Sequence, residues 1–341
     1  MASIKRTTIY DIARELNITP ASVSRALNDD HSIGKTTKER VKNTALRLNY
    51  KPNSNALHLS TGKSRTLGVV VPRINNNFFA NVIAGIESVA REKNYHVLIC
   101  QSFESFEVEV SCINTLIHQN VACIMISLST STTSTAHLEE ITKYHIPLIQ
   151  FDRTDEKLKS QIVINDNEEV VYEAIEHLAS QGYKRIAHLA GPQNVTIFRK
   201  RKEGFEKGLH SVQLPLYEGF IQYDCLTKEA GMEATFKLLN MKNPPDAIFA
   251  AADLGALGAL EAAKKMKISV PHTLGICGFS NEPYTELTTP SITTIDQDSF
   301  GMGETVADLF FENKQTAKKK LSKPVVIGPK LIVRESTNRK E

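Results

Sequence analysis

The sequence predicts an α/β protein in which a small all-α head precedes a large body of two doubly wound parallel-sheet subdomains. One observation predicts the helical head, and a second predicts the body of strands and helices. Apolar residues in the first 50 positions recur at helical spacing in short runs. Residues 66–341 instead alternate short apolar runs with amphipathic stretches, which is typical of parallel sheets covered by helices. The length of 341 residues, 41% of them hydrophobic, is sufficient for more than one core.

Charge is distributed unevenly along the chain. Residues 1–65 contain 12 Lys or Arg against 5 Asp or Glu, whereas the remainder contains 29 against 33. A basic head on a mildly acidic body predicts that the head binds a polyanion. No apolar run reaches the ~20 residues of a membrane span, and the N-terminus MASIKRTTIY has no secretory apolar stretch. We therefore expect a cytoplasmic protein.

The five cysteines are odd in number and form no CxxC pair. We interpret them as reduced, buried packing residues rather than as a zinc site or a disulfide framework. The ten histidines show no metal-ligand spacing, so we expect neither a metal nor a cofactor. The motifs GxSxG, HExxH, GxxxxGK[ST] and GxGxxG are absent, which argues against an enzyme.

Residues 8–27 have the pattern of a helix-turn-helix. Thr8 is a predicted N-cap, and the apolar residues after it lie on one helical face: Ile9, Ile12, Ala13 and Leu16. Thr19 and Pro20 begin a second helix after a short turn. Its outward residues Ala21, Ser22, Ser24 and Arg25 suit either a base-reading helix or a solvated helix of an ordinary bundle. A third helix is predicted over 35–48.

Pro52 ends the third helix, and Asn53 can cap a short helix that contains Ala56 and Leu59. Gly62-Lys63-Ser64 is no phosphate loop, because Leu57 occupies the position of the required glycine. We divide the chain into a head (1–52), a hinge helix and linker (53–65) and a body (66–341).

The body shows predicted strands at TLGVVV, HVLIC, CIMIS, PLIQF, IVIN, RIAHLAG, AIFAA and LGICGF. Predicted helices between the first four strands cover 78–93, 107–119 and 135–144. The polar stretch SLSTSTTST, residues 127–135, follows a strand end. Ligands of open sheets bind beyond the carboxyl ends of the strands, so a cleft between the two subdomains is the expected pocket.

The segments TIYDIARELNITPASVSRALN, TTKERV and LNYKPN closely resemble the head of the lactose-repressor (LacI/GalR) family. The likeness continues through RTLGVVVPRINNNFFANVIAGIE, GYKRIAHLAGP, FRKRKEGFEKGL, DAIFAAADLGALGALEAAK and LIVREST, and so spans nearly the whole chain. The resemblance implies a DNA-binding transcriptional repressor that is controlled allosterically by a small molecule such as a sugar.

The resemblance also implies site residues. The implied DNA contacts are Thr8, Thr19, Pro20, Ala21, Ser22, Ser24, Arg25, Asn28, Tyr50, Asn53, Ala56 and Leu59. Leu59 from two subunits would wedge into one central base step. The implied effector-binding residues are Phe78, Phe79, Ser129, Arg153, Asp166, Arg201 and Ser280, with Asp152 beside Arg153. The body departs from the family pattern at Ser280, Ala252 and Cys225, and the hinge segment departs from it at Leu57 and His58.

The resemblance also implies that the body has a periplasmic-binding-protein-like fold, with three crossovers between its lobes near Asn165, Ile295 and Gly328. Lobe one would then comprise about 66–164 and 296–327, and lobe two about 165–295 and 328–341. Reading a near-palindromic operator requires two heads, so we expect a homodimer that uses residues 78–89 and part of 300–311. The body alone would also suit a solute-binding protein, an alternative that the basic head disfavours.

Overall fold

The computed structural model describes residues 7–51, 64–315 and 323–339. The chain divides into two compact units, Met1–Ser64 and Arg65–Glu341, and each is described by itself. The boundaries predicted at 52 and 65 stay predictions, because residues 52–63 lie outside the described ranges.

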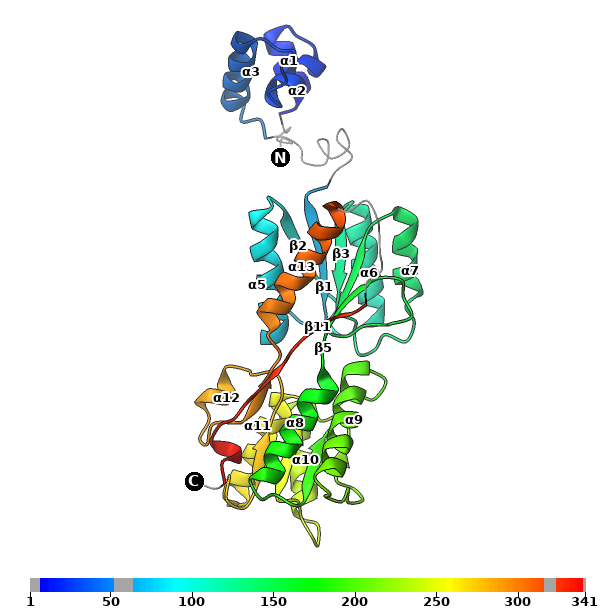
Figure 1. The fold of residues 1–341 in the computed structure, drawn as a ribbon. Helices are drawn as coiled ribbons and strands as arrows, with labels where there is room; N and C mark the ends of the chain where they lie inside the picture. The colour runs from blue at the N-terminus through cyan, green and yellow to red at the C-terminus, as the bar shows by residue number, and fades with distance from the viewer. Residues whose placement is uncertain (1–6, 52–63, 316–322, 340–341) are drawn as a thin grey trace, which may run out of the picture. The chain divides into compact units, whose positions relative to one another are not determined.

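The described part of the first unit contains three helices, α1 (Ile9–Leu16), α2 (Pro20–Leu27) and α3 (Lys35–Arg47) (Figure 1). The Asp11 carboxylate accepts hydrogen bonds from the backbone N–H of Thr8 (2.9 Å) and from its hydroxyl (2.7 Å), which fixes the start of α1. Thr19 Oγ1 accepts the backbone N–H of Ser22 at 3.1 Å and so caps α2. One small core joins the helices: Ile12, Ala13, Val23, Ala26, Val41 and Ala45. The predicted helix-turn-helix is confirmed.

Lobe one of the second unit is built on a six-stranded parallel sheet in the order β11-β5-β4-β3-β1-β2. The strands are β1 (Thr66–Val71), β2 (His96–Gln101), β3 (Cys123–Ile126), β4 (Leu148–Phe151), β5 (Gln161–Asn165) and β11 (Val325–Ile327). Helices α5 (Asn77–Glu92) and α13 (Ser299–Gln315) cover one face, and α6 (Phe106–His118) and α7 (Ala136–Ile141) cover the other. The predicted helix over 135–144 is shorter, because Thr142–Tyr144 tighten into a 3₁₀ turn.

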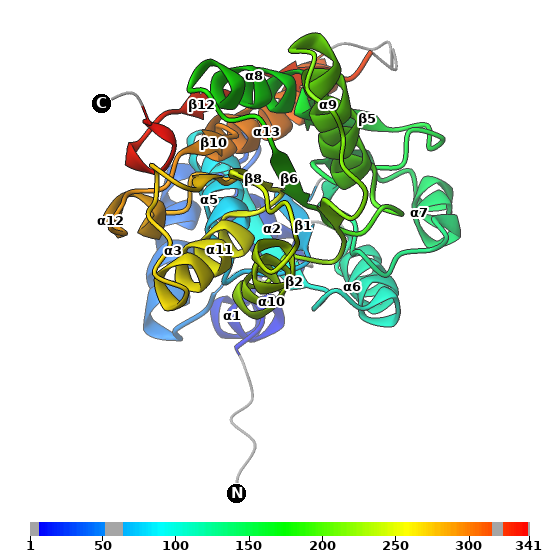
Figure 2. The ribbon, with the colours of Figure 1, turned by 90° about the horizontal axis from the view of Figure 1, so that it is seen from below.

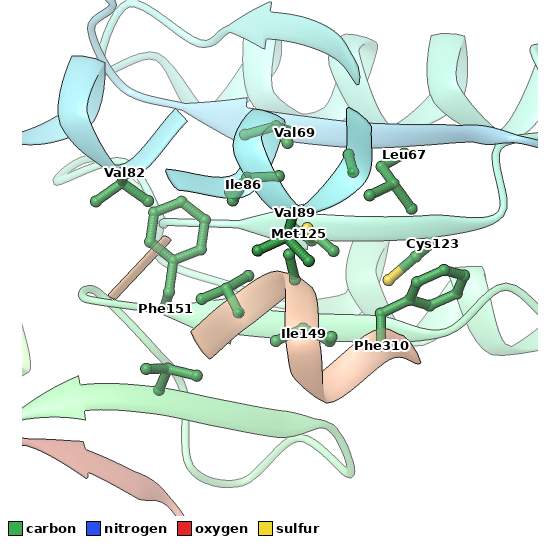
Figure 3. Packing of buried hydrophobic residues seen from close by; sticks show 14 of the residues in the cluster. Leu67, Val69, Val82, Ile86, Val89, Cys123, Met125, Ile149, Phe151 and Phe310 are labelled. Carbon is green, nitrogen blue, oxygen red and sulfur yellow. The ribbon is translucent and has the colours of Figure 1, made fainter. Parts of the chain in front are cut away.

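Alternate residues of each strand point to opposite faces, as the strand geometry requires. Leu67, Val69 and Val71 of β1 pack under α5 and α13, whereas Val70 packs toward α6. Figure 3 shows side chains of α5 and α13, among them Val82, Ile86, Val89 and Phe310, meeting those of β1, β3 and β4.

Close approach of α5 and α13 depends on two glycines. A Cβ on Gly85 would lie 2.2 Å from the carbonyl oxygen of Phe300, and one on Gly303 would lie 2.1 Å from that of Val82. The two helices therefore pack backbone against backbone over these positions.

Lobe two contains a four-stranded parallel sheet in the order β7-β6-β8-β9. Its strands are β6 (Ile186–Leu189), β7 (Ile221–Gln222), β8 (Ala247–Ala250) and β9 (Gly275–Cys277). Helices α8 (Asn167–Ser180) and α9 (Thr196–Ser211) cover one face, and α10 (Lys228–Leu239) and α11 (Asp253–Lys265) cover the other (Figure 2). A short helix, α12 (Tyr284–Leu287), follows β9.

The chain passes between the lobes at three places that one side chain connects. The Asn165 amide at the end of β5 donates to the carbonyl oxygens of Gln297 (3.0 Å) and Ile327 (3.2 Å). Gln297 follows β10 (Thr294–Asp296), and Ile327 precedes β12 (Lys330–Ile332); these two strands pair antiparallel. Asn165 is buried, so these hydrogen bonds fix the relative positions of the three crossover segments.

Candidate DNA-binding face and interlobe site

Helix α2 presents a polar, positively charged face to solvent. Ala21 and Arg25 are exposed, Ser22 and Ser24 are half-buried, and the buried face holds Val23 and Ala26. Within the described part of the chain, no carboxylate forms an ion pair with Arg25. The arginine fork is therefore available for an external acceptor.

The other predicted contact residues of the head differ in solvent exposure and in their structural roles. Thr8 and Thr19 are exposed but cap α1 and α2, and Pro20 is the first residue of α2. Asn28 is exposed at the C-terminal end of α2. Tyr50 is half-buried and packs against the head core. Asn53, Ala56 and Leu59 lie outside the described residues, and their roles stay predictions.

In the body, Arg201 of α9 is the most enclosed of the predicted site residues with a charge. Its side chain is 3% exposed. Nε donates to Asn167 Oδ1 (2.8 Å) and Nη1 donates to the Ala251 carbonyl oxygen (2.7 Å). The guanidinium carbon lies 3.5 Å from the ring centroid of Phe279. Burial lowers the pKa of Arg201 to about 9, which leaves it charged at neutral pH.

Arg153 faces the same region from lobe one, directly after β4. Its Nη1 donates to both carboxylate oxygens of Glu104 at 2.9 Å. Burial by itself would raise the pKa of Glu104, but Arg153 and the hydrogen bonds from Thr130 lower it below its ordinary value. Nε of Arg153 is buried and has no hydrogen-bond partner among the described residues.

Aromatic rings and guanidinium groups alternate across the boundary between the lobes. The Arg153 guanidinium lies 5.7 Å from the ring centroid of Phe79 in lobe one and 5.9 Å from that of Phe198 in lobe two. Phe198 is also 5.3 Å from the Arg201 guanidinium. The series Phe79–Arg153–Phe198–Arg201 therefore connects both lobes through cation–π contacts.

Asp152 precedes Arg153 and is 5% exposed. It adopts a left-handed backbone conformation with φ 58°, which carboxylate residues tolerate better than most. Burial raises its pKa above the ordinary value, while the charges of Arg153 and Arg201 act in the opposite direction. Its carboxylate accepts one long hydrogen bond from Ser127 Oγ (3.4 Å). Such a carboxylate can accept further hydrogen bonds from a polar ligand.

A pocket of about 270 Å³ opens beside Asp152 between the lobes. Asp166, Asn167 and Thr196 of lobe two line it, together with Thr154, Asn165 and Val326 of lobe one or the crossovers. Asp166 is exposed there and accepts the backbone N–H of Glu169 (3.1 Å), so it also caps α8.

Ser129 is buried in the polar loop after β3. Its backbone N–H donates to Glu109 (2.7 Å), and its hydroxyl is hydrogen-bonded to that of Ser102 (2.7 Å). The Glu109 carboxylate also accepts hydrogen bonds from His137 (2.9 Å) and from the Thr132 hydroxyl (3.0 Å). A fully buried carboxylate thus holds the loop, an arrangement that the sequence did not indicate.

The remaining predicted residues lie around this centre. Phe78 is buried in the lobe-one core and packs edge-on against Phe79. Ser280 is half-buried, with φ 123°, and its hydroxyl donates to Gln297 Oε1 (3.1 Å). Sequence reasoning missed Asn167, Phe198, Phe279 and Glu104. Phe198 begins the matched segment FRKRKEGFEKGL that contains Arg201, so its position could have indicated it. Asn167 and Glu104 are distant in sequence from the arginines that they bind.

No helix among the described residues has both the length and the apolar character that a membrane span requires. Across the same ranges, groups of three or more His, Cys, Asp or Glu side chains suited to a metal ion are not found.

Two family descriptions match the chain: "Bacterial regulatory proteins, lacI family" over residues 8–53 and "Periplasmic binding protein-like domain" over 175–337. The ribose operon repressor of Halalkalibacterium halodurans is 33% identical over 333 residues, which cover 97% of this chain and 97% of the relative. A LacI family transcriptional regulator from Enterococcus faecium, solved with bound ribose, matches with a TM-score of 0.72 at 28% identity over 81% of this chain and 100% of that one.

The fold of the whole chain matches that of the lac repressor dimer bound to operator and the anti-inducer ONPF, with a TM-score of 0.84 at 24% identity over 98% of this chain and 99% of that chain. The matched head separates the chain from solute-binding proteins that share only the body fold. The chain belongs to the lacI family of bacterial regulatory proteins and is a DNA-binding transcriptional regulator.

Proposed function

We propose that this regulator is a homodimeric repressor that binds a near-palindromic operator through α2 and is controlled by a small polar effector bound between the lobes. The observation that carries the proposal is the exposed face of α2, where Arg25 forms no ion pair within the described head, although its charge helps to lower the pKa of Asp30. We place the protein in the cytoplasm, because a regulator that binds operator DNA must share a compartment with it.

The chemistry of α2 suggests how bases are read. Arg25 suits a bidentate contact with a guanine edge, whereas Pro20 and Ala21 have no side-chain donor and suit apolar contact with a thymine methyl group. Two heads would read half-sites about one helical turn apart. The excess of basic residues in 1–65 predicts that affinity falls steeply with salt.

The body suggests a carbohydrate or a related polar metabolite as effector. Carboxylate and guanidinium groups at Asp152, Arg153 and Arg201 suit hydroxyl or carboxylate groups, and the rings of Phe79 and Phe198 suit the apolar face of a sugar. The relative named as a ribose operon repressor and the structure with bound ribose agree with this class. Binding roles account for all the residues that we assign, and the proposal includes no catalytic step.

Effector and operator must be coupled through the two lobes. A ligand that contacts both lobes stabilises one interlobe arrangement over another, and only this difference in affinity can change DNA binding. The coupling is reciprocal, so operator DNA must alter effector affinity by the same factor.

Binding-site selection from random duplex DNA tests the proposal. We expect the full-length protein to enrich a palindrome, and Arg25→Ala to lose discrimination at one position of each half-site by about 1–3 kcal/mol. Arg14→Ala on α1, also exposed, is the matched control and should keep the wild-type motif. Leu59→Ala should loosen the preference at the central step.

A wild-type selection that enriches no motif at low salt would contradict sequence-specific regulation. Equal motifs from the wild type and Arg25→Ala would remove Arg25 from the readout.

A further inference from the structure

A chain of buried side-chain amides links the crossover segments to two predicted effector residues of lobe two. Asn165, Asn167 and Gln297 carry the amides, and each is at most 6% exposed. Ser280 Oγ donates to Gln297 Oε1 (3.1 Å), and Gln297 Nε2 donates to Asn165 Oδ1 (3.3 Å). From the other side, Arg201 Nε donates to Asn167 Oδ1 (2.8 Å), and Asn167 Nδ2 donates to the Asn165 carbonyl oxygen (3.2 Å). Both effector residues are therefore connected to Asn165.

Two backbone carbonyl groups fix the direction of this chain. Asn165 Nδ2 lies 3.0 Å from the carbonyl oxygen of Gln297 and 3.2 Å from that of Ile327, and carbonyl oxygens only accept hydrogen bonds. The Asn165 oxygen must then face Gln297, so Gln297 Nε2 has to donate to it and Gln297 Oε1 has to accept from Ser280. The hydroxyl proton of Ser280 is therefore engaged inside the protein.

Ser280 is also held by its backbone. Its φ of 123° is one that residues with a Cβ rarely adopt, and its backbone N–H donates to the carbonyl oxygen of Ile295 on β10 (2.9 Å). Such a conformation persists only where the surrounding contacts impose it. Because side chain and backbone of Ser280 both bind the second crossover, a change at either one is felt by the other.

We propose that Asn165, Asn167 and Gln297 are positioning residues that couple the effector site to all three crossovers, by fixing the Ser280 hydroxyl and the Arg201 guanidinium. This inference rests on the proposed function, in which Ser280 and Arg201 contact the effector. A ligand that moves either side chain disturbs hydrogen bonds that meet at Asn165, where the three crossover segments are joined. The coupling is reciprocal, so a change in the crossovers also reorients the two side chains.

Hydrogen exchange of the full-length protein, without DNA or ligand, tests the coupling. Ser280→Ala removes the hydroxyl and keeps the Cβ and its backbone constraint. We expect amide exchange in residues 161–167 and 325–332 to rise about two- to ten-fold, the range that the loss of one hydrogen bond supplies. Tyr183→Phe is the matched control: it removes a hydroxyl that donates to the Pro271 carbonyl oxygen (2.8 Å) elsewhere in lobe two, and should leave both segments unchanged.

A second substitution separates coupling from a purely structural effect. Gln297→Met has a similar length but no polar side-chain group that can continue the chain, so Ser280→Ala should add no further change in its background. Independent effects would instead add. Asn167→Leu tests the connection to Arg201 in the same way and should raise the exchange of 325–332; no change there would remove Arg201 from the coupling.

The proposal is overturned by unchanged exchange of 325–332 in Ser280→Ala, by an equal rise in Tyr183→Phe, or by a full additional rise in the Gln297→Met background. Because neither DNA nor effector enters the measurement, these outcomes leave the proposed function standing.

Thiol labelling checks that each variant keeps the fold. Cys123, Cys225 and Cys277 are buried and should stay unlabelled, whereas Cys100 and Cys112 are half-buried, contrary to the expectation of buried packing residues, and should react. If Gln297→Met exposes the buried thiols, Asn165→Leu interrupts the same chain and takes its place.

Discussion

Replacing Arg201 by lysine tests whether its planar guanidinium organises lobe two. The change keeps one positive charge but removes the fork that donates to Asn167 Oδ1 (2.8 Å) and to the Ala251 carbonyl oxygen (2.7 Å). It also removes the flat cation that stacks on Phe279 at 3.5 Å. These partners lie at the start of α8 and just after β8 and β9, so one side chain connects three segments of the lobe.

The expected loss follows from the contacts. An ammonium group can reach one of the two acceptors, and the other is left buried without a donor at a cost of about 1–3 kcal/mol. Loss of the stacked contact adds about 1 kcal/mol. An ammonium is more strongly hydrated than a guanidinium, so its burial gives no compensation. We expect the free energy of unfolding of the body to fall by about 2–4 kcal/mol.

Urea unfolding followed by far-UV circular dichroism measures this difference, since the chain has no tryptophan. Arg199→Lys is the matched control on the same helix: Arg199 is half-exposed and makes only a 3.4 Å hydrogen bond and a 3.9 Å ion pair. We expect the control to change stability by less than about 0.5 kcal/mol. Equal midpoints for the two variants, at equal denaturant slopes, would refute the role given to the guanidinium.

Two further predictions concern packing and pH. Gly303→Ala places a Cβ 2.1 Å from the carbonyl oxygen of Val82 and forces α5 and α13 apart. We expect its urea midpoint to show that the free energy of unfolding has fallen by about 1–3 kcal/mol. The control Gly328→Ala places a Cβ that meets nothing within 4 Å, and it should unfold like the wild type. Burial lowers the pKa of His188 to about 4 from its ordinary 6.5, because the neutral ring is stacked between Phe205 and Phe249. The unfolded chain then binds the proton first, so the stability present above pH 6.5 falls as the pH is lowered from 6.5 to 4, by up to about 3 kcal/mol. Urea midpoints measured across this range should decline less for His188→Gln, and parallel declines would show that other groups are responsible.

Much of the fold was predictable because local pattern and tertiary structure agree. Apolar runs of four to six residues became buried strands, and the capping residues Thr8 and Thr19 marked helix starts correctly. The contact between Gly85 and Gly303 was not predictable, because it depends on two helices that are adjacent in space and distant in sequence. The helix over 135–144 was extended too far, because helical spacing of apolar residues does not distinguish an α turn from a 3₁₀ turn.

The site was predictable where the resemblance supplied a matched position, as it did for Arg153 and Arg201. Their surroundings were not. Glu104 lies 49 residues from Arg153, and Asn167 lies 34 residues from Arg201, so only the folded chain shows that these pairs are hydrogen-bonded. The roles proposed for these residues in effector binding stay predictions until a ligand is tested.

The contacts between the lobes set what an effector has to do. Arg153 is held by Glu104 and reaches Phe198 of lobe two only through a 5.9 Å cation–π contact, which contributes about 0.5–2 kcal/mol. Shifting a two-state equilibrium from 1:99 to 99:1 requires a difference of about 5.5 kcal/mol in ligand affinity between the states. The buried Nε of Arg153 lies 3.9 Å from Asp152 Oδ2 and has no hydrogen-bond partner among the described residues. This Nε and the Asp152 carboxylate offer charged hydrogen bonds, each contributing about 1.5–3 kcal/mol. Two or three such bonds supply this difference when one ligand makes them in a single interlobe arrangement, by contacting Asp152 or Arg153 of lobe one together with lobe two.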